Sequence, residues 1–449
     1  MDAYLTLLNT LLQPDQTARK QAEQHFKNQA KTDPKFPLIL LEITLNSEVP
    51  SSLRQSAIVN LRRHITNNWS GIEERHEVDI LPEARAVLKE NLFKVLADPE
   101  SKIRAAGASC LSTIASHDWP HDFGNFCPEL LKYLSESISQ NAALIVLQEF
   151  SQDIDVQNLN EFVNTFFQPL AKIVLNKDEK LLDKMDGMMV FYHGFNLSSE
   201  CDGKSKKIMA QNVEPCVDLI NNNLTMESSS PEYFGLLTSS IKVATLLLRH
   251  FAKVFLPSLQ TVLNNTWAIF TSSIALYQEH YINNDSGNSL DSELDNGDKI
   301  GISTFLSETI LFLTEITTTK TGKKLISPMM GEILSCLVIL SQVTAGTEEE
   351  WNDDIETFHD DQEAIISGSY SMAVTCIVRA VAQEAIIEVM PCEYSFKVIF
   401  AGVRLTCTTC KNNIFLLDLT TRIQQITISA NCEKISHREV GLLLKNKNF

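Results

Sequence analysis

Two stretches of the sequence, about fifty residues apart, follow the same pattern. The first runs from Arg54 to Trp69 (RQSAIVNLRRHITNNW) and the second from Ile103 to Pro120 (IRAAGASCLSTIASHDWP). In each, an arginine near the start is followed by small and apolar residues at intervals of three and four, and a tryptophan stands close to the end. Matching helices that recur along a chain are typical of repeat proteins, in which each unit buries its apolar face against the next. The chain is therefore expected to be an array of helical repeats.

The hydrophobic content and the net charge of the chain indicate which kinds of molecule it could bind. The chain has 449 residues, of which 44% are hydrophobic, and this is ample material for a core. A formal net charge of −18 disfavours nucleic acid or an anionic membrane as the direct partner, because both would be repelled, whereas a basic protein would be attracted. An acidic surface that serves only solubility remains an equally good interpretation of charge taken alone. The longest apolar stretches are too short and too interrupted to span a bilayer, so no membrane insertion is expected.

Helical periodicity continues far beyond the two matching stretches, and the helices come in pairs separated by short polar breaks. The expected pairs are 3–12 with 15–30, 35–46 with 51–67, 80–97 with 100–116, 128–138 with 141–153, 159–176 with 178–197, 205–225 with 231–250, 253–282 with 300–319, and 323–344 with 367–389.

The third pair carries a polar signature as well. Asp98 lies at the turn between its helices, and Arg104 follows six residues later on the second helix. This spacing is that of a HEAT repeat, in which such residues interact with counterparts in neighbouring repeats and form a polar ladder along the stack. The expected fold class is therefore all-α, a HEAT-repeat α-solenoid that winds as a right-handed superhelix of antiparallel helix pairs.

Three regions and two polar loops are expected along the chain. Residues 1–120 form the first set of repeats, residues 121–390 form further repeats, and residues 391–449 remain an unassigned tail. Within the middle region, residues 283–299 are rich in Asp, Asn and Ser and are expected to form a solvated loop. Residues 346–363 hold nine carboxylates and no lysine or arginine, and they form the second loop.

The acidic second loop has two interpretations. Its densely spaced carboxylates and two aromatic residues could bind a basic partner, with the aromatic rings as apolar anchors. A solvated charge run is the alternative. The candidate contact residues are Glu348, Glu349, Glu350, Trp351, Asp353, Asp354, Phe358, Asp360 and Asp361.

Several of these features together resemble a known family. Ala22-Glu23-Gln24, Phe26, Arg54-Gln55-Ser56-Ala57, Trp69 and Asp118-Trp119-Pro120 all fall where the N-terminal pattern of the importin-β (karyopherin) family places them. The acidic loop around Trp351 and Phe358 is similar to an insertion of importin-9-like karyopherins. One departure is Leu61-Arg62-Arg63, where the family usually has Leu-Lys-Asn. Another is Asn141-Ala142-Ala143, where the family has Gly-Ala-Leu, so the resemblance does not fix the packing of the fourth repeat. Karyopherins of this type are also about twice as long or more, so the chain looks truncated at its C-terminus.

The resemblance implies a nuclear import receptor and not an enzyme. Its expected partners are the GTP form of the GTPase Ran, basic cargo proteins of the histone or ribosomal-protein type, and nucleoporins. The receptor would be a monomer without cofactors that shuttles between cytoplasm and nucleus. The resemblance places Ran on the inner helices, with Arg54, Gln55, Arg62, Arg63 and Arg104 as contacts. A static HEAT-repeat scaffold without GTPase dependence is the alternative function.

Signatures of catalysis and of metal binding are weak. Thr321-Gly322-Lys323-Lys324 lacks the first glycine and the hydroxyl residue of a phosphate-binding loop, and no Gly-x-Ser-x-Gly motif occurs. Cys407 and Cys410 have the spacing of half a zinc site, but a second pair at compact spacing is missing. We expect no metal there, and no catalytic residue is predicted.

Overall fold

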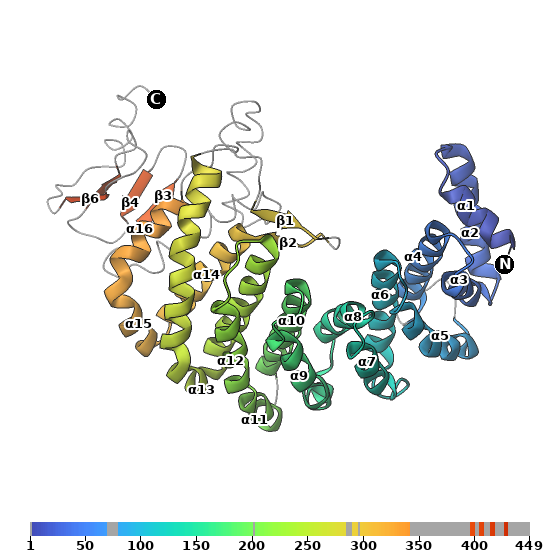
Figure 1. Ribbon diagram of the computed structural model, residues 1–449, viewed down its shortest axis with the longest axis horizontal. Coiled ribbons are helices and arrows are strands. Elements are labelled where there is room, and N and C mark those ends of the chain that lie inside the picture. The colour runs from blue at the N-terminus through green and yellow to red at the C-terminus, as the bar shows by residue number, and fades with distance from the viewer. Residues whose placement is uncertain are drawn as a thin grey trace. The chain divides into compact units, whose positions relative to one another are not determined.

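The computed structural model describes residues 2–69, 80–200, 203–283, 290–294 and 297–341, together with four short C-terminal strands. These residues divide into two compact units, Met1–Met209 and Ala210–Phe449. Figure 1 shows a succession of helices in each unit. The all-α HEAT-repeat solenoid expected from the sequence is confirmed as the architecture of the helical part of the chain.

The first unit consists of five antiparallel helix pairs, all close to the expected ranges. They are α1 (Asp2–Leu11) with α2 (Gln16–Thr32), α3 (Phe36–Leu45) with α4 (Ser51–Asn68), α5 (Pro82–Val95) with α6 (Ser101–Asp118), α7 (Phe126–Leu134) with α8 (Gln140–Gln152), and α9 (Leu159–Leu175) with α10 (Leu181–Leu197). From the second pair on, the first helices α3, α5, α7 and α9 contact one another in one row, and the second helices α4, α6, α8 and α10 contact one another in another. In this two-row stacking, each helix pair buries its apolar face against the next pair.

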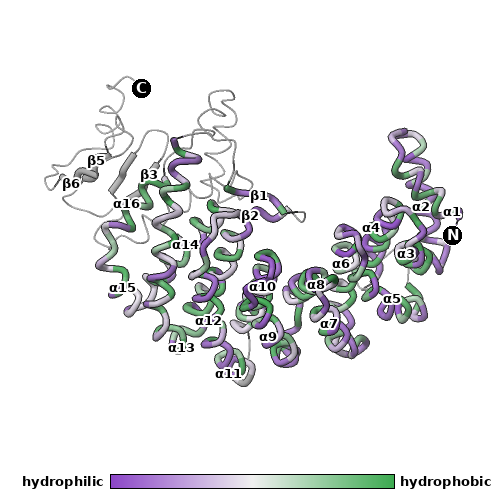
Figure 2. The backbone as a smooth tube through the Cα atoms, in the orientation of Figure 1, coloured by the Kyte–Doolittle hydropathy of each residue, from purple (hydrophilic) through white to green (hydrophobic). Residues whose placement is uncertain are grey.

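The core of the first unit runs without interruption from one repeat to the next. Each helix alternates hydrophobic and hydrophilic residues along its length (Figure 2). A chain of aromatic rings marks the core: Phe126 lies 5.0 Å from Phe150 between ring centroids, and Phe150 lies 6.0 Å from Phe162. These rings are almost fully buried. Adjacent repeats therefore share one core and stabilise one another.

Trp69, which ends α4, is held by the following helix. It is 1% exposed, and the Arg85 guanidinium on α5 lies 4.7 Å from its ring centroid. Arg85 also donates hydrogen bonds to the carbonyl oxygens of Trp69, at 2.7 Å, and of Ile80, at 3.1 Å. The stacking and the two hydrogen bonds together fix the end of one repeat against the beginning of the next.

The second unit begins within α11 (Gly203–Gln211) and departs from a regular array. It contains α12 (Val213–Leu224), α13 (Pro231–Tyr277), α14 (Ile302–Thr317), α15 (Lys320–Ile326) and α16 (Met330–Leu340). The sequence predicted a break between helices 231–250 and 253–282, but α13 continues through it without a loop. The break is a kink at Phe251, whose φ of −126° and ψ of 31° are not helical.

Helix α14 packs against α13. Phe305 lies 5.8 Å from Phe234 between ring centroids, and Arg249 forms an ion pair with Glu315. These contacts join the second helices of the sixth and seventh expected pairs, 231–250 and 300–319, in the same way as second helices contact one another in the first unit. The expected pairing of 300–319 with 253–282 stays a prediction.

Part of the expected solvated loop at 283–299 is an ordered hairpin. Strand β1 (Asp291–Glu293) pairs antiparallel with β2 (Lys299–Gly301). The Asp291 carboxylate accepts hydrogen bonds from the Tyr281 hydroxyl at 2.8 Å and from the Ser303 backbone N–H at 3.0 Å. Gly301 has a φ of 145°, which favours glycine, and an added Cβ would collide with Asp291. The hairpin is thus fixed to both neighbouring helices.

The C-terminal region contains four strands among its described residues, β3 (Phe396–Ile399), β4 (Arg404–Cys407), β5 (Ile414–Leu417) and β6 (Ile426–Ser429). They pair antiparallel as β3 with β4 and β5 with β6. The expected helix 367–389 and the acidic loop 346–363 lie outside the described residues.

Candidate functional site

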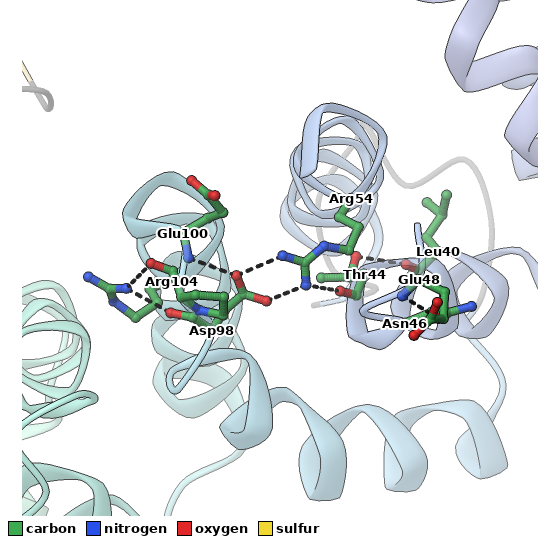
Figure 3. Close-up of polar contacts among 9 residues, drawn as sticks. Leu40, Thr44, Asn46, Glu48, Arg54, Asp98, Glu100 and Arg104 are labelled. Atoms are coloured by element: carbon green, nitrogen blue, oxygen red, sulfur yellow. Dashed lines mark hydrogen bonds and ion pairs between the residues drawn. The ribbon is translucent and has the colours of Figure 1, made fainter. Parts of the chain in front are cut away.

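A polar ladder crosses the interface between the second and third repeats. The Arg54 guanidinium donates to both carboxylate oxygens of Asp98, with Nη1 to Oδ2 at 2.6 Å and Nη2 to Oδ1 at 3.0 Å (Figure 3). Arg54 also donates to the carbonyl oxygen of Thr44 at 3.3 Å, and only 7% of Arg54 is exposed. A buried, bidentate pair of this kind fixes the orientation of the two helices that carry it.

Asp98 organises the start of α6 at the same time. Its Oδ1 accepts the Glu100 backbone N–H at 2.9 Å, and its own carbonyl oxygen accepts Arg104 Nη1 at 2.7 Å. Arg104 donates to the Pro99 carbonyl as well, at 3.0 Å. Figure 3 shows Arg104 turned back over the turn that precedes its own helix. Asp98 therefore contacts a neighbouring repeat, as the ladder hypothesis predicts, whereas these two hydrogen bonds of Arg104 stay within its own repeat.

The five arginine and glutamine residues expected to contact Ran differ in their exposure to solvent. Arg54 is buried in the ion pair, and Arg104 on α6 is half-buried. Arg62 and Arg63 are exposed on α4, and Gln55 on the same helix is half-buried. The structure thus provides two exposed cations on α4, the helix that the Arg54–Asp98 pair joins to the next repeat, and they lie more than two turns along α4 from that pair.

The next two helices of the row carry hydroxyl and carboxylate groups. Ser109 Oγ on α6 donates to Glu149 Oε1 on α8 at 2.8 Å, and Ser112 Oγ donates to Glu149 Oε2 at 2.5 Å. Ser116 lies one turn further along α6, with Oγ 3.5 Å from Asp153 Oδ2. Sequence analysis did not single out these residues, although Ser, Ser, Thr and Ser at 109, 112, 113 and 116 have the spacing of one helix face.

A groove of about 460 Å³ lies over this hydroxyl face. Its lining residues are Ser112, Thr113, Ser116, His117, Glu149, Gln152 and Asp153, of which His117 is exposed. Arg62 and Glu149 both act electrostatically on the buried Cys110 thiol of α6: burial raises the pKa of that thiol, Arg62 opposes the rise and Glu149 adds to it. The second-helix row thus carries the exposed Arg62 and Arg63 on α4 and the half-buried Glu149 on α8.

The fourth repeat is completed by a polar contact with the fifth. Asn141 Nδ2 on α8 donates to Asp183 Oδ1 on α10 at 2.7 Å. Burial is the main cause that raises the pKa of Asp183, and the hydrogen bond from Asn141 opposes it. The polar residue at position 141 thus has a structural role, which is to satisfy a buried carboxylate.

The acidic candidates Glu348, Glu349, Glu350, Trp351, Asp353, Asp354, Phe358, Asp360 and Asp361 lie outside the described residues. The Cys407 backbone belongs to β4, and Cys410 lies outside them. Among the described residues, no group of three or more His, Cys, Asp or Glu side chains could hold a metal ion. In the same part of the chain, no helix is both long and apolar enough to cross a membrane.

Comparisons with known proteins agree with this architecture. Residues 22–98 match the model of the importin-beta N-terminal domain. Importin-9 of Drosophila melanogaster is 25% identical over 80% of this chain and 36% of its own length, and an importin beta-like SAD2 homolog of Arabidopsis thaliana is 27% identical over 36% of this chain and 16% of its own. The chain thus spans about a third of the length of the first relative.

Solved structures show the same fold at low sequence identity. The exportin Cse1 in its cargo-free, cytoplasmic state has a TM-score of 0.61 at 14% identity, covering 86% of this chain and 41% of Cse1. Yeast importin-beta, Kap95p, has a TM-score of 0.51 at 14% identity, covering 86% of this chain and 46% of its own. The N-terminal domain match, the importin relatives and the helix-pair solenoid together support membership of the importin-β family.

Proposed function

We propose that the chain is a nuclear transport receptor that binds basic cargo proteins and the GTP form of Ran, and carries cargo through the nuclear pore. The observation that carries the proposal is the exposed pair Arg62 and Arg63 on α4, within the segment that matches the importin-beta N-terminal domain. The proposal includes nucleoporins as partners, since one solved structure of the same fold is a complex of Kap95 with Nup1.

We assign two different roles to the arginines of α4, one in positioning the helix and one in contacting the GTPase. The Arg54–Asp98 pair holds α4 against α6, so the exposed arginines are presented on a surface whose orientation is fixed. Pre-organisation lowers the entropy lost when a partner binds. Arg62 and Arg63 would contact an acidic region of the GTPase, and Arg54 would act by positioning the helix. Gln55 and Arg104, both half-buried, would contribute at the edge of this contact.

Cargo binding would use the acidic character of the chain. The net charge of −18 attracts basic proteins and speeds their encounter, and salt screens this attraction. The nine carboxylates of residues 346–363, with Trp351 and Phe358 among them, would supply a further contact for a basic cargo. Coupling between the two partners through the solenoid would allow Ran-GTP to promote cargo release.

The test is binding of the full chain to immobilised Ran loaded with GTP or with GDP. The proposal predicts at least tenfold tighter binding to Ran-GTP, a preference that Arg62→Glu/Arg63→Glu weakens through a slower association rate. The matched control is Lys172→Glu/Lys177→Glu, which makes the same charge change at exposed residues at the end of α9. Equal binding to both nucleotide states would support the alternative, a static HEAT-repeat scaffold.

A further inference from the structure

Two segments of the second unit contain almost no acidic residues. From Tyr233 to Gln278 the sequence has no Asp or Glu, and from Thr309 to Gly331 it has only Glu315, although the chain has 56 acidic and 38 basic residues. A surface that serves only solubility usually has charges of both signs interspersed. The exposed lysines of these two segments form what we call the basic edge, which consists of Lys253, Lys320, Lys323 and Lys324.

The packing of three helices brings these lysines to one edge of the second unit. Arg249, in α13, donates from Nε and Nη2 to Glu315 Oε2 on α14, at 3.0 and 2.5 Å. Lys253 follows four residues after Arg249, just past the kink at Phe251. Two residues after α14 ends, α15 begins at Lys320. Helix α15 contacts both α14 and α13, and Figure 1 shows it beside the lower part of α13.

The turn between α14 and α15 holds the lysines of α15 on an ordered backbone. Thr319 Oγ1 accepts the Gly322 backbone N–H at 2.9 Å, and the Thr318 backbone N–H donates to the Glu315 carbonyl oxygen at 3.0 Å. An added Cβ at Gly322 would collide with the carbonyl oxygen of Ile316, so α15 begins in close contact with the end of α14. A partner would therefore bind without first having to order this backbone.

The lysines of the basic edge have no acidic partner in the part of the chain that the structure describes. Glu315 is paired with Arg249, and none of the ion pairs among the described residues includes Lys253, Lys320, Lys323 or Lys324. Each lysine ammonium offers three donors and no acceptor. The chemical complement of the basic edge is therefore a group of carboxylates.

From this arrangement we propose that the basic edge binds a short acidic segment of a partner protein. A long polyanion, such as nucleic acid, would also meet the negative charge of the remaining chain, whose net charge is −18. A short segment avoids this repulsion, because exposed charges are screened beyond about 8 Å at physiological ionic strength. A basic cargo would be repelled by the same lysines, so the acidic partner is distinct from the cargo of the proposed function.

The experiment measures binding of a labelled peptide of alternating Glu and Gly to the full chain by fluorescence anisotropy. The same peptide with Gln in place of Glu should bind much more weakly, and added salt should remove the difference. Lys320→Gln/Lys323→Gln/Lys324→Gln should weaken the Glu peptide about tenfold, since three exposed ion pairs are lost together. Arg249 is left unchanged, because its ion pair with Glu315 holds α13 against α14.

A matched control makes the same charge change in the first unit. Lys172→Gln/Lys177→Gln/Lys180→Gln alters three exposed lysines at the end of α9 and before α10, and it should change peptide affinity by less than about twofold. Circular dichroism should show that both variants are folded, because all six lysines are exposed. Carbodiimide coupling, which joins carboxylates to amines in contact, should attach the Glu peptide to lysines of the basic edge, as identified by mass spectrometry.

Three outcomes would overturn the proposal. Equal losses of affinity in the two triple variants would indicate general electrostatic attraction. Tighter binding of a single-stranded RNA of the same charge, lost in the α15 variant, would make the edge a nucleic-acid surface. Self-association of the parent that the α15 variant abolishes would make a second copy of the chain the occupant.

The same variants separate this proposal from the proposed function. Preference for Ran-GTP over Ran-GDP should be unchanged in the α15 triple variant, and binding of the Glu peptide should persist in a chain that fails to distinguish the two nucleotide states. Retained Ran-GTP preference without selective binding of the Glu peptide would overturn the basic-edge proposal alone.

Discussion

Arg54 and Asp98 are 44 residues apart in the sequence and form a bidentate ion pair in which each side chain is 8% exposed. The pair connects the second helix of one repeat to the inter-helix turn of the next. Removing one member would leave the other charge buried without its partner, a change that usually costs more than the pair itself contributes.

We therefore expect Arg54→Met and Asp98→Asn each to lower the free energy of unfolding by about 3 kcal/mol, and the double variant to lose clearly less than the sum. Urea denaturation followed by circular dichroism measures all three. Arg249→Met is the matched control, because Arg249 pairs with Glu315 but its side chain is 53% exposed; it should cost under about 1 kcal/mol. Strict additivity of the Arg54 and Asp98 effects would show that the pair is not energetically coupled.

A second prediction concerns the close approach of α5 and α6 at Gly107. An added Cβ at Gly107 would lie 2.6 Å from Val95 Cγ1, well inside van der Waals contact. Gly107→Ala should destabilise the protein by about 1–3 kcal/mol despite alanine's better helix propensity, and adding Val95→Ala should relieve the clash at the cost of a lost contact.

The control for Gly107 is Gly331 on α16, where an added Cβ meets nothing within 4 Å. Gly331→Ala should stabilise the protein by up to about 1 kcal/mol. Thermal unfolding measures both substitutions, and equal shifts of the same sign would contradict the packing argument.

The third prediction is a pH dependence that arises from His64. Burial lowers the pKa of this residue from 6.5 to about 4, and its ring packs 5.1 Å from Phe36. Since the unfolded chain binds the proton more readily, the contribution of His64 to stability is complete above pH 6.5 and is lost as the pH falls toward 4.

His64→Gln should remove this component, so that the difference in unfolding free energy between parent and variant changes by about 3 kcal/mol between pH 7 and pH 4. Urea denaturation at a series of pH values gives the difference directly. A parent and variant with parallel pH profiles would contradict the assignment.

A fourth prediction tests the contact of Arg85 with Trp69. Arg85→Lys keeps the charge but cannot reproduce both hydrogen bonds and the stacked geometry, so we expect a loss of about 1–2 kcal/mol. The control is the reverse substitution Lys94→Arg, elsewhere on α5, which should change the free energy of unfolding very little. Hydrogen exchange at the C-terminal amides of α4 should rise in Arg85→Lys if the contact fixes that end of the helix.

Much of the fold follows from local sequence signals. Helical periodicity predicted the pairs of the first unit within a few residues, because each helix has an apolar face that is visible in the sequence of that helix alone. The hairpin at 291–301 was missed, because its strands are three residues long and depend on contacts of Asp291 with Tyr281 and Ser303. Such contacts between segments leave no periodic signal.

The candidate site was harder to predict than the fold. The sequence indicated that Arg54 matters but not that its guanidinium is buried, because that depends on Asp98 in the next repeat. Glu149 was missed for the same reason, since its partners Ser109 and Ser112 lie on another helix. Residues of a repeat protein acquire their roles from neighbours about forty positions away.

The kink in α13 has a mechanical consequence. Successive helices joined by a loop can tilt about many bonds, whereas the two halves of α13 meet at one residue, Phe251, whose ring is 5% exposed. Pro257 also lacks the backbone N–H that would bond one turn back, so the second half is softest near its beginning. Any bending of α13 at the kink would displace the buried Phe251 side chain. A change in the angle between the two halves of α13 would therefore require a rearrangement of the core around Phe251.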